Sequence, residues 1–143
     1  MLGRVRILSC LGEKLRILRR AGQRVCERLI KSRRDVVAVF IVGSVARGDI
    51  HEASDVDMCV VIREEGKPGR ESIQELGCKV DVAYVPLRLW LEKLWRDVGS
   101  MWEINVSSIL NSIILYEVLL GKLPGDLRGV LRYSWLSGVC IPG

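Results

Sequence analysis

The run VVAVFIV, residues 36–42, constrains the fold of this chain more than any other stretch. It is continuously apolar and rich in β-branched residues, which is typical of a central strand covered on both faces. The run ends at Gly43, and the segment SVARG that follows is predicted to begin a short helix. After the polar loop DIHEAS, a second strand is predicted over DVDMCVVI, residues 55–62. The chain is therefore expected to build a sheet whose middle is covered on both faces.

Apolar residues at helical spacing predict helices around these strands. A helix is predicted after Pro86, over LRLWLEKLWRD (87–97), and another apolar helix at about 100–110. The N-terminal helix is predicted from roughly residue 10 to 33, where the apolar positions are Leu11, Leu15, Leu18, Val25 and Leu29.

The remaining segments complete a small sheet. The segment REEGKPGRESIQELG, residues 63–77, is polar and contains Gly and Pro, so it is predicted to connect elements rather than to pack. A third strand is predicted over KVDVAYV (79–85) and a fourth, short strand over SIILY (112–116). This order of elements predicts an α/β (α+β) domain with a small mixed β-sheet flanked by helices.

Composition and length favour one globular domain. The chain has 143 residues, of which 49% are hydrophobic and 27% charged, and no apolar run approaches the ~20 residues that span a bilayer. Charges interrupt the first apolar stretch, so it is a poor secretion signal, and the protein is expected to be cytoplasmic and not membrane-bound. The five cysteines are never spaced as CxxC, and with the lone His51 they offer no zinc constellation.

The charge is unevenly placed. The whole chain has a net charge of +5, but residues 1–34 contain eleven Arg and Lys against two Glu, a net of +9. Such a basic helix can bind nucleic acid, the phosphates of a nucleotide or an acidic partner. The alternative is a solvated helix face that happens to be basic, and the sequence leaves the two open.

Three acidic residues lie in the predicted strands. Asp55 and Asp57 are two apart and therefore project from the same face of their strand. Asp81 is flanked by Val80 and Val82 in the same manner on the next apolar strand. If these strands are neighbours, the three carboxylates converge on one face, where they repel one another and raise each other's pKa.

A hard divalent cation would resolve this repulsion. Proteins bind Mg²⁺ through one or two carboxylates together with substrate phosphates, and two such ions can clamp the attacking and leaving oxygens of a nucleotidyl transfer. Gly43 lets the backbone approach phosphates, and Ser44 offers a hydroxyl and an N–H at the start of the predicted helix.

These residues resemble the minimal nucleotidyltransferases of the DNA polymerase β superfamily. The family pattern is a strand ending in Gly-Ser, a gap of ten residues, Asp-x-Asp in a second strand, and a third acid on a third strand. Here the parts are Gly43-Ser44, the residues 45–54, Asp55-Val56-Asp57, and Asp81 in KVDVAYV. The variant GSVARGD…SDVD resembles the nucleotidyltransferase antitoxins that are paired with HEPN-domain toxins. The resemblance covers residues 36–85 and extends to SIILYE (112–117).

The resemblance implies one nucleotidyltransferase domain over residues 1–143: a basic amphipathic helix region (1–34), a catalytic core (36–117) and a C-terminal tail (118–143). It implies that two Mg²⁺ ions act with ATP as substrate. Asp55, Asp57 and Asp81 would be both the metal ligands and the catalytic residues, and Gly43 and Ser44 would bind the nucleotide. Arg47 would pair with triphosphate oxygens, with an ordinary helix-surface arginine as the alternative.

The expected reaction transfers AMP from ATP to a hydroxyl group. Few residues follow Asp81, so the acceptor is expected on another macromolecule, and the resemblance suggests a tyrosine of a HEPN-type toxin as protein partner. Two alternatives stay open. One is nucleotidyl transfer to nucleic-acid ends or a small molecule, and the other is a non-enzymatic antitoxin that acts by binding alone. A homo-oligomer is also left open.

Overall fold

The computed structural model describes residues 2–63, 65–97 and 111–118. The predicted helix at about 100–110 and the tail after Val118 lie outside the described residues. The elements in chain order are α1 (Leu2–Ser32), β1 (Val36–Val42), α2 (Gly43–Arg47), β2 (Val56–Ile62), β3 (Gly69–Glu75), β4 (Cys78–Pro86), α3 (Leu87–Asp97) and β5 (Ile113–Glu117).

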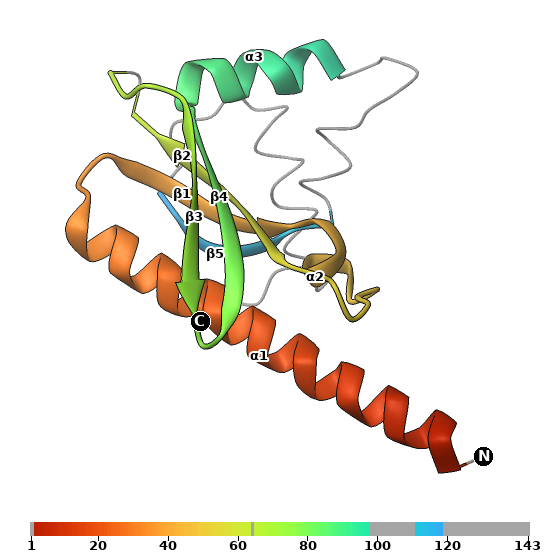
Figure 1. Cartoon of the computed structure of the whole chain (residues 1–143). Helices are drawn as coiled ribbons and strands as arrows, with labels where there is room; N and C mark the ends of the chain where they lie inside the picture. The colour runs from red at the N-terminus through yellow and green to blue at the C-terminus, as the bar shows by residue number, and fades with distance from the viewer. Residues whose placement is uncertain (1, 64, 98–110, 119–143) are drawn as a thin grey trace.

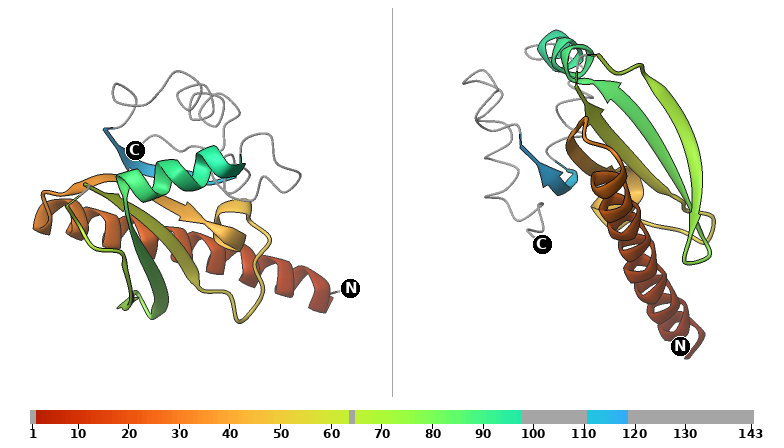
Figure 2. Two further views of the ribbon diagram at one scale, coloured as in Figure 1. Left: turned by 90° about the horizontal axis from the view of Figure 1, so that it is seen from above. Right: turned by 90° about the vertical axis from the view of Figure 1, so that its left-hand side faces the viewer.

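The five strands form one mixed sheet in the order β3-β4-β2-β1-β5. Strands β2 and β4 are parallel, and the other three neighbouring pairs are antiparallel. Helix α1 runs across one face of the sheet and α3 lies on the other (Figures 1 and 2). The predicted α+β fold, with a small mixed sheet flanked by helices, is confirmed.

Two apolar cores lie on the two faces of the sheet. The larger one joins α1 to the sheet through residues such as Leu18, Val25 and Met58. The smaller one joins α3 to the sheet, where Trp90 stacks on Phe40 with 5.8 Å between ring centroids. β1 contributes to both cores, as its continuous apolar sequence predicts. No helix among the described residues is long and apolar enough to cross a membrane.

Helix α1 begins earlier than its apolar pattern indicated. It starts at Leu2 instead of about residue 10, and Figure 1 shows its first turns projecting beyond the sheet. The periodic residues Leu18, Val25 and Leu29 are buried as predicted. A helix that leaves the sheet no longer needs an apolar stripe, so its start cannot be read from that stripe.

The prediction that residues 63–77 only connect elements is wrong. This segment contains β3, which pairs with β4 in antiparallel register and forms the edge of the sheet. Leu76 and Gly77 make the two-residue turn, both with positive φ (51° and 74°), as type I′ hairpin turns require. Most side chains of β3 are exposed, so the strand lacks the apolar alternation by which a half-buried strand is recognised.

Candidate active site

Two of the three predicted carboxylates are direct neighbours across the sheet. In the parallel pairing of β2 with β4, Asp57 is the register partner of Asp81. Val56 and Met58 are buried against α1, so Asp57 projects from the opposite face, and Asp81 does the same between Val80 and Val82. The condition that the two strands must be neighbours is therefore met.

Asp55 lies one residue before β2 and is half-buried. The electrostatics link it to the pair, because the charges of both Asp81 and Asp55 raise the pKa of Asp57. Desolvation of the Asp57 carboxylate is the largest cause of the raised pKa, and the nearby cations Arg70 and Lys79 partly offset it. The three carboxylates therefore lie close enough to repel one another, and the nearby cations only partly compensate their negative charge.

Gly43 lies directly against Asp57. Its φ is +72°, a conformation that residues with a Cβ atom rarely adopt, and an added Cβ atom would lie 3.0 Å from Oδ2 of Asp57. Both facts require glycine here. Ser44 follows in α2 and is half-buried. The start of α2 is thereby held next to the carboxylate of β2.

Arg47 is the last residue of α2 and is exposed. Its Nε lies 3.3 Å from Oδ2 of Asp49, which is also exposed. This surface ion pair is compatible with the alternative of an ordinary helix-surface arginine, and an exposed pair of this kind is weak enough to exchange partners.

The edge strand β3 contributes residues that the sequence reading missed. The hydroxyl of Ser72 donates a hydrogen bond of 2.6 Å to Oδ1 of Asp81, its register partner. Nζ of Lys79 lies 3.7 Å from the same oxygen. The sequence signal that could have found Ser72 is Gly77, a turn residue at the point where residues 69–75 fold back along the strand that contains Asp81; Leu76 before it is not a typical turn residue.

A hollow of about 620 Å³ opens beside the carboxylates. Asp57, Asp81, Ser72 and Arg70 contribute to its lining, and Cys59 and Ala83 are small side chains beside them. Gly43, Ser44 and Arg47 are not among its described lining residues. Burial raises the pKa of the Cys59 thiol to about 11, so this cysteine stays protonated and is no nucleophile at neutral pH. The volume lies within the range of small-molecule sites.

The sequence profile of the nucleotidyltransferase domain matches residues 23–94, which is half of the chain. The matched segment contains the Gly43 turn, all three carboxylates and Ser72. The chain belongs to the nucleotidyltransferase domain family. A domain of this kind generally uses an NTP and a divalent metal ion.

The fold of this chain is similar to a crystal structure of a nucleotidyltransferase-like protein from Exiguobacterium sibiricum 255-15, with a TM-score of 0.53 and 15% sequence identity. The similarity covers 78% of this chain but only 37% of that one, so this chain spans little more than a third of its structural relative. Among curated proteins, none matches the chain in sequence.

The donor atoms of the nucleotidyltransferase site suit a hard divalent cation. The described residues contain no group of three or more His, Cys, Asp or Glu side chains arranged to hold a metal ion by themselves. Mg²⁺, however, needs only one or two carboxylates when substrate phosphates and waters complete its shell. The neighbouring carboxylates of Asp57 and Asp81, and the raised pKa of Asp57, fit a cation that arrives with the nucleotide.

Proposed function

We propose that this chain transfers AMP from ATP to a hydroxyl group of a macromolecular acceptor, with pyrophosphate as the leaving group and Mg²⁺ as its cofactor. The observation that carries this proposal is the register pairing of Asp57 with Asp81 beside the turn at Gly43. It supports a site in which carboxylates and a phosphate-approaching backbone meet, as an attack on a metal-bound phosphate requires.

The chain's own residues would divide the work as follows. Gly43 brings the backbone close to the triphosphate, and Ser44 donates hydrogen bonds to it from the start of α2. Asp55 and Asp57 hold Mg²⁺ together with the phosphates, and Asp81 completes the site on the acceptor's side and helps to remove the proton of the hydroxyl group. When bound, Mg²⁺ neutralises phosphate charge and polarises the phosphorus–oxygen bond.

The acceptor we propose is a tyrosine of a HEPN-type toxin, which the added AMP would silence. The resemblance of GSVARGD…SDVD to nucleotidyltransferase antitoxins supports this choice. This part of the proposal concerns the partner and can fail while the nucleotidyl transfer itself stands. An antitoxin that acts by binding alone would leave the partner unlabelled.

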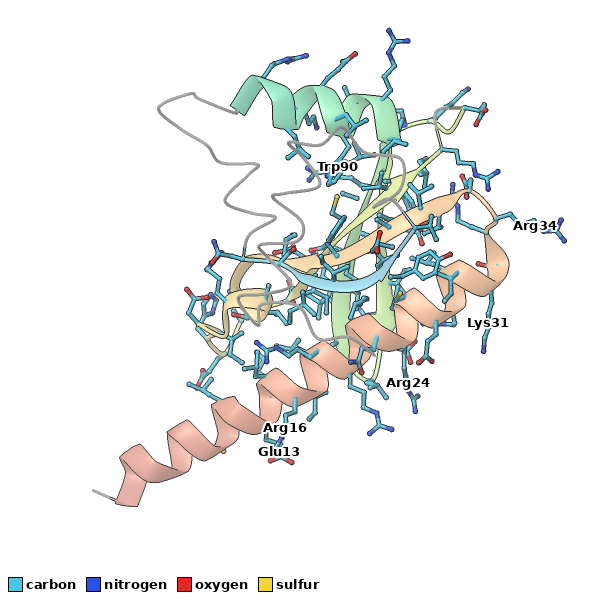
Figure 3. All side chains as sticks on the ribbon, turned by 180° about the vertical axis from the view of Figure 1, so that it is seen from behind. Glu13, Arg16, Arg24, Lys31, Arg34 and Trp90 are labelled. Carbon is cyan, nitrogen blue, oxygen red and sulfur yellow. The ribbon has the colours of Figure 1, made fainter. Side chains whose placement is uncertain are left out.

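One observation favours nucleic-acid ends as the alternative acceptor. Figure 3 shows Arg16 and Lys31 pointing away from the sheet on α1, whereas Arg24 lies 3.7 Å from the carboxylate of Glu75 at the end of β3. Arg16, Arg20 and Arg24 also line a second hollow of about 510 Å³ on this helix. If this basic face binds nucleic acid, affinity should fall steeply with salt, and replacing Arg16, Arg20 and Lys31 by Gln should flatten that dependence.

The test is incubation of the protein and Mg-ATP with two candidate acceptors, a HEPN-domain protein and a single-stranded oligonucleotide. Label from α-labelled ATP should appear on the HEPN protein and label from γ-labelled ATP should not, because a kinase alone would give the opposite result. Asp57→Asn is the inactive control. Labelling of the oligonucleotide instead would replace the proposed acceptor, and no label on either with intact Mg-ATP binding would contradict both acceptors.

A further inference from the structure

The segment from Gly43 to Ser54 joins two parts of the proposed site and has little apolar anchoring of its own. It begins at the glycine that lies against Asp57 and ends immediately before Asp55. Of these residues, all of which the structure describes, only Val45 and Ser54 are buried. Val45 belongs to the larger core, and Ala46 and Ile50 pack against it, but the residues 47–49 and 51–53 are exposed and need polar contacts to fix their position.

Arg19 on α1 binds the first half of this segment. Its Nε donates to the carbonyl oxygen of Val45 (3.1 Å) and its Nη2 to that of Ala46 (3.2 Å), and both bonds are partly buried. The last carbonyl groups of a helix lack intrahelical donors and carry partial negative charge. The guanidinium of Arg19 therefore supplies both hydrogen-bond donors and a positive charge at this end of α2. Arg19 thus ties α2, with Gly43 and Ser44 at its start, to α1.

Lys14, on the same helix, binds the second half. Its Nζ donates to the carbonyl oxygen of His51 at 3.1 Å and also to that of Glu52. The loop closes around this point, because the amide of His51 donates to Oγ of Ser54 and the amide of Ser54 donates to the carbonyl of His51. Lys14 therefore fixes the turn that leads directly into Asp55.

Helix α1 lies very close to the sheet where it crosses it. A Cβ atom added at Gly22 would meet Cδ1 of Ile41 at 2.8 Å and Cγ1 of Val56 at 3.4 Å, so the helix approaches the sheet very closely at this point. Ile41 lies two residues before Gly43, and Val56 follows Asp55. Helix α1 therefore lies close to the residues that flank the Gly43–Ser54 segment, to which Arg19 and Lys14 donate hydrogen bonds.

We propose that Arg19 and Lys14 are positioning residues of the nucleotide site, a role that rests on the function proposed above. Both lie outside residues 23–94, the part that matches the nucleotidyltransferase domain. The N-terminal half of α1 is therefore part of the working site. Lys14 and Arg19 donate hydrogen bonds to backbone carbonyl groups of the Gly43–Ser54 segment, whereas Arg16 and Arg20 are exposed.

The test compares Arg19→Gln with Arg34→Gln, which removes the same charge from an exposed residue two positions after the end of α1. Arg19→Gln should weaken Mg-ATP binding about tenfold by isothermal titration, because it removes two charge-assisted hydrogen bonds to the segment. Arg34→Gln should stay within about twofold of the original protein on the same scale. Arg19→Lys retains the cation and should recover part of the loss. Near-normal binding by Arg19→Gln, or an equal loss in both glutamine variants, would overturn the proposal.

A second measurement does not depend on nucleotide. Deuterium uptake of peptides covering residues 43–54, without ligand, should rise in Arg19→Gln and Lys14→Gln but not in Arg34→Gln. Unchanged uptake in the first two would refute the anchoring even if the enzyme is active. If the original protein binds no Mg-ATP, the proposed function fails and the uptake comparison alone decides the anchoring. If Arg19→Gln does not fold, Arg19→Lys and Lys14→Gln answer the same question.

Discussion

Gly43 and Asp57 touch across the end of the sheet: a Cβ atom at position 43 would lie 3.0 Å from Oδ2 of the carboxylate. At this contact the backbone of the turn after β1 lies against the side chain of Asp57 on β2. Any side chain at position 43 would either push the carboxylate aside or move the turn.

Gly43→Ala is therefore expected to damage both stability and binding. The positive φ alone costs an L-residue about 1–2 kcal/mol, and the contact with Asp57 should in addition weaken Mg-ATP binding. Urea unfolding and titration with Mg-ATP measure the two effects. Gly77→Ala is the matched control, since Gly77 also has a positive φ, +74°, but nothing lies within 4 Å of an added Cβ. Gly77→Ala should lose stability and keep its affinity; equal losses of affinity would contradict a specific contact at Gly43.

Asp81→Asn should separate binding from chemistry. Asp81 is proposed to act on the acceptor's side, so its loss should leave Mg-ATP binding largely intact while label transfer falls on the order of 10³-fold. Single-turnover kinetics with α-labelled ATP measures the rate of label transfer, and a titration measures the affinity for Mg-ATP. Glu92→Gln, on the exposed side of α3, serves as control. Near-normal transfer by Asp81→Asn would mean that another acid has this role.

Ser72→Ala should reduce transfer without unfolding the protein. The hydroxyl of Ser72 donates to Oδ1 of Asp81 at 2.6 Å, and an exposed hydrogen bond to a charged group of this kind contributes about 1 kcal/mol, or roughly fivefold in rate. Ser72→Thr retains the hydroxyl and should retain most activity. Gln74→Ala, two residues along the same strand and exposed, is the control. An unaffected rate in Ser72→Ala would show that Asp81 needs no such partner.

Asp57 should make the ligand-free protein less stable at neutral pH. Its pKa is raised in the folded state, so the folded protein binds this proton more tightly than the unfolded chain does. The free energy of unfolding must then fall as the pH rises from the ordinary aspartate pKa of 3.8 through the higher folded pKa. Asp57→Asn removes the charge, so it should raise the melting temperature at pH 7 without metal or nucleotide, and this gain should vanish below the ordinary pKa. A variant less stable than the original at pH 7 would contradict the raised pKa.

Much of the fold follows from local sequence. The unbroken, β-branched apolar run 36–42 predicted a strand buried on both faces, and it packs into both cores. The spacing of Leu18, Val25 and Leu29 placed the buried stripe of α1 correctly, and the alternation around Asp57 placed its carboxylate opposite Met58. These features were predictable because periods of 3.6 and 2 residues are set by the backbone of one segment alone.

The neighbours of each strand were decided only in three dimensions. The local sequence does not predict that β4 lies parallel to β2, the pairing that brings Asp81 beside Asp57. It also does not predict that the polar residues 69–75 form the edge of the sheet, where Ser72 meets Asp81. The same holds for Arg19 and Lys14, whose basic character was visible in the sequence while their targets were not, because the carbonyl groups they bind carry no signature of residue type. The sequence by itself determined which faces are apolar and which residues are charged; the tertiary structure decided which of them meet, because pairing between distant segments depends on the packing of the whole sheet against its helices.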